Sequence, residues 1–112
     1  MCGIIGVTSS SNVQDSIISS LRRLEYRGYD SSGLATISNN KLNLCRAKGK
    51  INNLTSKLEE TPLEGSIGIG HTRWATHGNI SVDNAHPHVS GKVAIVHNGI
   101  IENYQKIKDE LI

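Results

Sequence analysis

The sequence predicts an α+β fold in which sheets pack against helices. Apolar residues recur with the period of a strand in some segments and of a helix in others. Their order is strand, helix, hairpin, helix, strand, loop, strand, helix. Among the 112 residues, 37% are hydrophobic and 20% charged, which is typical of a globular chain and excludes a collagen-like or disordered one. Because the chain has no Phe, we expect Ile, Leu and Val to form its core.

The N-terminal segment predicts a strand followed by a helix. The short apolar run at 2–7 contains β-branched residues and is bounded by serines, so it predicts a buried strand. Asn12 stands where a helix N-cap is expected. Apolar side chains then recur at intervals of four, four and three between residues 13 and 24, and Gly28 is placed to end the helix.

The remaining elements follow from turn residues and apolar spacing. The Asn-Asn pair at 39–40 tolerates positive φ and predicts the tight turn of a hairpin. Helical spacing predicts helices over 51–58 and 104–111. Glycines alternate with Ile in 67–71, which predicts a strand with a closely approaching neighbour, and 93–96 is the next strand.

Composition and charge restrict the partners. A net charge of +2 with scattered Lys and Arg disfavours nucleic acid. No run approaches the roughly 18 apolar residues of a membrane span, and residues at the start of the sequence lack the basic region and long apolar run that predict a signal peptide. We therefore expect a cytoplasmic protein with no membrane partner, in which Cys2 and Cys45 stay thiols.

Cys2 is a candidate nucleophile. Removal of Met1 would place its thiol and a free α-amine on one residue. An α-amine has a pKa of about 7.7–8.0, so part of it is neutral near physiological pH and can accept the thiol proton. The alternative is that Cys2 is only a small buried side chain at the start of a strand.

The run His-Thr-Arg-Trp-Ala-Thr-His-Gly at 71–78 is a candidate binding loop. The guanidinium of Arg73 can pair with a carboxylate through two hydrogen bonds, and Thr76 and His77 add short-range ones. Such a loop could hold an amino acid. The alternative places Arg73 on the surface and uses Trp74 to fill the core.

Asn98 and Gly99 are candidate oxyanion-hole residues. Acyl transfer needs hydrogen-bond donors aimed at a developing oxyanion, and an Asn amide with a glycine N–H supplies two. The alternative is an ordinary Asn-Gly turn.

Five histidines raise a different possibility, a metal site. His86 and His88 flank Pro87 and could present two imidazoles together. Their spacing matches no zinc pattern, so we expect no metal and no cofactor.

Five segments resemble the class II glutamine amidotransferases, which are N-terminal-nucleophile hydrolases. The segments are 1–6, 22–31, 71–78, 84–88 and 97–103. Within that family, the runs Glu-Tyr-Arg-Gly-Tyr-Asp-Ser and His-Thr-Arg-Trp-Ala-Thr-His-Gly point to the glucosamine-6-phosphate synthases. The resemblance implies a four-layer α/β/β/α sandwich. Residues 1–112 would be the N-terminal portion of its glutaminase domain, incomplete at the C-terminus and without the sugar-isomerase domains.

The resemblance also implies a reaction. Cys2 attacks the side-chain amide of L-glutamine, its α-amine acts as the base, and ammonia and then glutamate are released. Asn98 and Gly99 match the oxyanion hole. In the whole enzyme, ammonia passes to fructose 6-phosphate and forms glucosamine 6-phosphate.

Four further residues match positions with known roles in the family. Arg73, Thr76 and His77 match the side chains that hold glutamine, and Trp74 matches the gate through which ammonia passes. The whole enzymes are homodimers, and we expect that contact to involve mainly the absent domains.

We expect the isolated chain to be inactive or weakly active. If Met1 is retained, the α-amine of Cys2 is a peptide nitrogen and the base is lost. The alternative function is a non-catalytic remnant that binds glutamine or a partner subunit.

Overall fold

The computed structural model describes residues 3–25, 29–73, 85–97 and 104–111. The predicted order of elements is confirmed, with one additional short strand at 88–90. The sequence of this strand, His-Val-Ser, contains one apolar residue, which is too few to indicate a strand. The elements in these ranges are β1 (Gly3–Thr8), α1 (Gln14–Arg23), β2 (Ser31–Ser38), β3 (Lys41–Lys48), α2 (Ile51–Glu60), β4 (Ile67–Arg73), β5 (His88–Ser90), β6 (Val93–Ile95) and α3 (Tyr104–Leu111).

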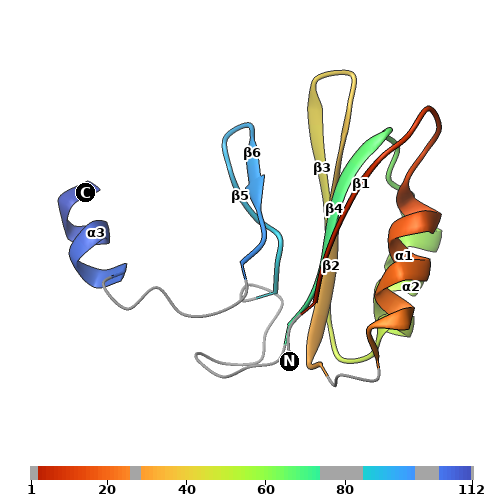
Figure 1. Cartoon of the computed structure of the whole chain (residues 1–112), viewed down its shortest axis with the longest axis horizontal. Coiled ribbons are helices and arrows are strands. Elements are labelled where there is room, and N and C mark those ends of the chain that lie inside the picture. Colours follow the sequence, from red (N-terminus) through yellow and green to blue (C-terminus); the bar gives the residue numbers. More distant parts are fainter. Residues whose placement is uncertain (1–2, 26–28, 74–84, 98–103, 112) are drawn as a thin grey trace.

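The strands form two antiparallel sheets. The larger one has the order β1-β4-β2-β3, and the smaller one is the hairpin β5-β6. Helices α1 and α2 cover one face of the larger sheet, and the β5-β6 hairpin stands on its other face (Figure 1). We call these the helix face and the hairpin face.

The predicted turn between β2 and β3 is confirmed. Asn39 and Asn40 have φ of 51° and 61°, which is the left-handed region that Asn tolerates better than most residues. The turn pairs Ser38 with Lys41 and sets the register of the whole hairpin.

Helix α1 differs from the prediction at both ends. Its N-cap is Val13 rather than Asn12, and no side chain caps it. The Asn12 Oδ1 instead accepts a hydrogen bond from the Gly65 backbone N–H, at 3.1 Å. The helix ends at Arg23, before the expected Gly28, which lies outside the described residues. The predicted N-cap was therefore wrong because a contact distant in sequence takes up the Asn12 side chain.

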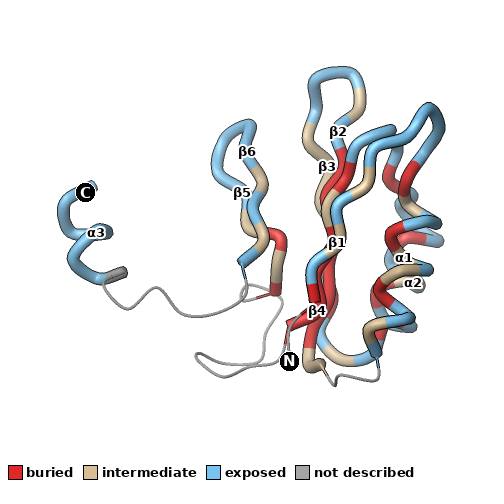
Figure 2. The backbone as a smooth tube through the Cα atoms, in the orientation of Figure 1, coloured by how far each residue is buried: buried red, intermediate tan, exposed pale blue. Residues whose placement is uncertain are grey.

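The hydrophobic core lies between the helices and the sheet (Figure 2). Gly68 and Gly70 of β4 allow α1 to approach closely, because a Cβ at either position would lie 2.6 Å from the Ile17 side chain. The predicted close neighbour of this strand is thus confirmed, as is a core of mainly aliphatic residues. Its members are Val13, Ile17, Leu21, Leu34, Ala47, Ile51, Leu54, Leu58 and Leu63.

The hairpin face is much less covered. Ile4, Ile37 and Ile67 are each about half exposed on the strands, at 45%, 47% and 53%. The α3 side chains from 105 to 111 are exposed as well, and α3 lies beyond the hairpin (Figure 2). Within the described ranges, no helix has the length and apolar character needed to cross a membrane.

Candidate active site

The larger sheet brings three chain segments together at one end. In the pairing of β1 with β4, Gly3 lies opposite Thr72. In the pairing of β2 with β4, Ser31 lies opposite Arg73. The start of β1, the start of β2 and the end of β4 therefore lie side by side. Gly3 directly follows the predicted nucleophile Cys2 in the sequence.

Thr72 holds the start of β1 in place. Its side chain is fully buried, and its Oγ1 accepts a hydrogen bond from the Gly3 backbone N–H, at 3.1 Å. A Cβ at Gly3 would lie 2.5 Å from Leu24 Cδ1, so a larger residue here would require the Leu24 side chain to move. The residue after Cys2 is thus fixed by both a hydrogen bond and a steric contact.

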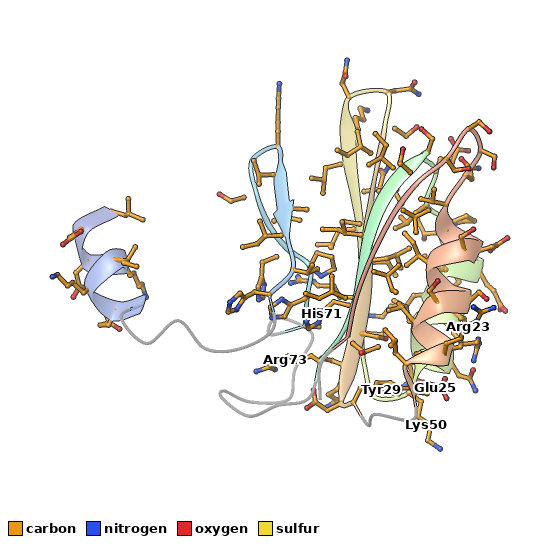
Figure 3. The ribbon with its side chains drawn as sticks, in the orientation of Figure 1. Arg23, Glu25, Tyr29, Lys50, His71 and Arg73 are labelled. Carbon is orange, nitrogen blue, oxygen red and sulfur yellow. The ribbon has the colours of Figure 1, made fainter. Side chains whose placement is uncertain are left out.

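Arg73 is a predicted binding residue that the structure describes. It is only 9% exposed, and its carbonyl accepts a hydrogen bond from the Asp30 backbone N–H, at 2.7 Å. Successive strand residues point to opposite faces, so Arg73 and His71 share the hairpin face (Figure 3). A largely buried cation at this position is suited to pairing with a carboxylate.

Two neighbouring serines are candidates that sequence reasoning missed. Ser31 and Ser32 begin β2, and both are fully buried. Neither hydroxyl has a hydrogen-bond partner among the residues that the structure describes. Buried hydroxyls of this kind are uncommon in folded proteins, so they mark this sheet end as polar. A Ser-Ser pair in a sequence has no pattern that would distinguish it from an ordinary strand start.

Three histidines stack beside the same strand end. The rings of His71 and His86 lie with their centroids 4.2 Å apart and their planes 20° from parallel. The His88 ring lies 4.3 Å from that of His86, tilted by 51°. His71 is fully buried, whereas His86 and His88 are partly buried.

This environment keeps His86 neutral. The pKa of His86 is lowered from 6.5 to about 3, mainly by burial and to a smaller extent by the charges of the neighbouring His71, His88, Arg73 and His97. Burial also lowers the pKa of His88, with the positive charges of Arg46 and Arg73 acting in the same direction. Both rings are therefore uncharged hydrogen-bonding groups at physiological pH.

Two of these rings bind the main chain of His97. The His71 Nε2–H donates a hydrogen bond to the His97 carbonyl oxygen, at 3.2 Å. The His97 backbone N–H donates to His86 Nδ1, at 3.3 Å. Since a carbonyl can only accept and an N–H can only donate, these contacts fix the proton position on each ring.

Strands β2 and β3 hold the segment that carries His86. A Cβ at Gly33 would collide with the His86 carbonyl oxygen, so glycine allows this backbone to cross β2. The Arg46 Nη1 donates to the Ala85 carbonyl oxygen, at 3.3 Å. The histidine stack is thus attached to the sheet by main-chain contacts as well as by its rings.

The other predicted site residues cannot be placed in the same way. Arg73 lies at the end of the sheet where β1 begins with Gly3, the residue after Cys2. His97 lies near the same end, beside His71. The predicted residues that lie outside the described ranges are Cys2, Trp74, Thr76, His77, Asn98 and Gly99.

Four of the five histidines of the metal alternative, all except His77, lie within the described residues. No group of three His, Cys, Asp or Glu side chains there is arranged to hold an ion. The His86 ring instead contacts the rings of His71 and His88.

Relatives in sequence extend over the whole chain. Glutamine–fructose-6-phosphate aminotransferase [isomerizing] from Bartonella quintana is 60% identical over 112 residues. The proteins of the same name from Mesorhizobium japonicum and Zymomonas mobilis are 59% and 56% identical. Each match covers 100% of this chain, and the chain spans 18% of the length of each relative. No family model matches the chain.

Solved structures show the same fold. One is the glutamine phosphoribosylpyrophosphate amidotransferase from B. subtilis, complexed with ADP and GMP, with a TM-score of 0.80 and 24% identity. A second, the allosteric regulatory enzyme of purine biosynthesis, has a TM-score of 0.82 and 25% identity. Both matches cover 99% of this chain, and 24% and 25% of those chains. The resemblance predicted from the sequence is therefore confirmed: the chain is similar over its whole length to part of the glutamine–fructose-6-phosphate aminotransferases, and its fold is that of the N-terminal-nucleophile amidotransferases.

Proposed function

We propose that this chain is the N-terminal portion of a glutaminase domain and carries the nucleophile that releases ammonia from L-glutamine. The observation that carries the proposal is the convergence of β1 and β4. Gly3, which follows Cys2, donates a hydrogen bond from its backbone N–H to the Thr72 side chain. Thr72 is followed by Arg73, the predicted carboxylate-binding residue. Identity of 55–60% with glutamine-dependent aminotransferases over this whole region supports the same chemistry.

The proposed reaction begins at the Cys2 thiol. Its proton passes to the α-amine while sulfur forms a bond to the side-chain amide carbon of glutamine. The C–N bond then breaks, the nitrogen takes up the proton, and ammonia leaves a glutamyl thioester. Water hydrolyses the thioester and releases glutamate with the thiol restored. Asn98 and Gly99 donate hydrogen bonds to the oxyanion of each tetrahedral intermediate.

Arg73 is proposed to hold the substrate at its carboxylate, with Thr76 and His77 as further binding residues. The low exposure of Arg73 favours this role, because an ion pair shielded from water is stronger than one on the surface. Trp74, which follows Arg73 directly, is proposed as the gate for ammonia.

The complete reaction requires more chain than is present here. We propose that sugar-isomerase domains deliver the ammonia to fructose 6-phosphate, giving glucosamine 6-phosphate, in a cytoplasmic homodimer. The relatives of this chain are named for fructose 6-phosphate and are more than five times as long, which supports that assignment. The isolated chain is proposed to have little or no activity of its own.

Intact mass after treatment with the glutamine analogue 6-diazo-5-oxo-norleucine tests the nucleophile. We expect loss of Met1 and one adduct, located on Cys2 by peptide mapping. Cys45 is the internal control, because burial raises the pKa of its thiol and leaves less reactive thiolate. Cys2→Ser should abolish the adduct.

Two results would contradict the proposal. One is equal labelling of the two cysteines in chain that has lost Met1. The other is rapid glutamate release by chain shown to retain Met1. No labelling of the Met1-free chain would favour a non-catalytic remnant that binds glutamine or a partner subunit.

A further inference from the structure

The main chain of His97 is held from both sides by histidine rings. His71 reaches it from β4 and donates to its carbonyl oxygen, while His86 accepts from its N–H. His71 is fully buried and stacked on His86, so neither ring can turn without disturbing the other. His97, which follows β6, is thereby held against β4, the strand that also binds Gly3 through Thr72.

We call these two hydrogen bonds the clamp on His97, and its position in the sequence connects it with the proposed reaction. His97 immediately precedes Asn98 and Gly99, the predicted oxyanion-hole pair, and it has no side-chain role in the proposed reaction. His71 immediately precedes Thr72, which fixes the residue after Cys2. Adjacent residues of β4 thus hold the chain next to the nucleophile and the chain next to the oxyanion hole, on opposite faces of one strand.

We propose that His71 and His86 are positioning residues that set Asn98 and Gly99 relative to Cys2 by clamping the main chain of His97. The inference rests on the proposed function, which it deepens. Neither histidine touches the substrate in this role. Both act through the backbone of His97.

The clamp requires particular protonation states. His86 Nδ1 must be unprotonated to accept from His97, and the groups that face it favour this. They are His71 and Arg73 from β4, His88 from β5 and His97, while Arg46 from β3 faces His88. None of these groups is a carboxylate that would stabilise a charged His86 ring.

The test compares two ligands of the Met1-free chain. L-glutamate γ-semialdehyde reacts with a thiol to form a tetrahedral adduct with an oxyanion, whereas L-glutamate occupies the site without forming one. We expect His71→Ala and His86→Ala to weaken the semialdehyde at least roughly tenfold while changing glutamate binding little, because a misplaced oxyanion donor affects only the tetrahedral state.

Conservative variants separate positioning from general damage. His86→Asn places an amide oxygen near the position of Nδ1, and His71→Gln places an amide nitrogen near that of Nε2. Both should restore semialdehyde binding to within about threefold, on the same basis. His88→Asn is the matched control, since His88 contacts His86 only through its ring, and it should leave the ratio of the two affinities unchanged.

The inference is overturned if the alanine variants weaken both ligands equally, or if Asn and Gln fail to rescue them. If the Met1-free chain binds neither ligand, the proposed function fails for this chain, and hydrogen exchange tests separately whether the two rings hold the main chain of His97. In that case the His97 amide should exchange at least roughly tenfold faster in His86→Ala than in His86→Asn, because the variant loses its acceptor. Equal exchange in the two variants would contradict the clamp.

Discussion

The two faces of the four-stranded sheet differ in the kind of side chains that they carry. On the helix face, α1 and α2 cover a core of aliphatic side chains, many of them fully buried. On the hairpin face, histidine rings stack beside the end of β4, and three isoleucines of the sheet remain about half exposed. The difference indicates that the helix face stabilises the fold while the hairpin face positions polar groups.

Strand β4 serves both faces through the alternation of its side chains. Gly68 and Gly70 point toward α1, where Ile17 fills the space that side chains would take. His71 and Arg73 stand near the strand end, where the hairpin segment meets the sheet. A substitution whose side chain lies on one face of β4 should therefore leave the contacts of the other face unaltered.

The largest effect is expected from a cavity on the helix face. Leu54 is fully buried in α2, so Leu54→Ala should lower the free energy of unfolding by about 2–5 kcal/mol, measured by urea denaturation. Leu111→Ala, at a position 81% exposed, is the control and should change it by less than about 0.5 kcal/mol. Folded Leu54→Ala should still label at Cys2. If folded Leu54→Ala fails to label at Cys2, the two faces are not separate.

A smaller loss is expected from overpacking the same face. Gly70→Ala adds a Cβ that would lie 2.6 Å from Ile17, so it should destabilise the fold by about 1–3 kcal/mol. Gly6→Ala is a matched control, because a Cβ at Gly6 has nothing within 4 Å. Thermal unfolding of both variants gives the comparison. Equal losses would mean that the contact between β4 and α1 is less tight than the structure shows.

On the hairpin face, stability should depend on pH through His86. The unfolded chain takes up a proton on this ring near pH 6.5, whereas the folded chain does so only near pH 3. The unfolded state therefore binds more protons between these values, and the free energy of unfolding should fall as pH falls from 6.5 toward 3. The slope should stay below the roughly 1.4 kcal/mol per pH unit of one whole proton, because His86 is partly open to water.

His86→Asn should make that dependence shallower in urea titrations across the same range. His88 remains in both proteins and contributes in the same direction, since burial lowers its pKa too. The difference between the two proteins therefore isolates His86. Identical slopes would contradict the neutral ring that the clamp on His97 requires.

The sequence predicted the helix face better than the hairpin face. Leu54 and Leu58 recur at helical spacing, and the Asn39-Asn40 turn has a local chemical cause, so local rules were sufficient there. The Asn12 contact with Gly65 joins residues far apart in sequence, and no local pattern contains it.

The site shows the same division. Arg73 is predicted as a binding residue from its residue type within a motif, whereas the hydrogen bonds from His71 and His86 to His97 depend on how β4 meets the hairpin. In the sequence those histidines suggested a metal site instead. Their actual partners are backbone atoms, which carry no sequence signal.

The smallest predicted effect on stability comes from a carbonyl oxygen that accepts hydrogen bonds from two side chains. The Thr36 hydroxyl donates to the Glu64 carbonyl oxygen at 2.7 Å, and Asn43 Nδ2 donates to the same oxygen at 3.3 Å. Thr36→Val should therefore cost only about 0.5–1 kcal/mol, because the carbonyl keeps one donor. Asn43→Ala should cost less, since its bond is longer and exposed. The double variant should lose more than the sum, because the carbonyl then loses both donors. A strictly additive double variant would show that the two donors do not substitute for each other.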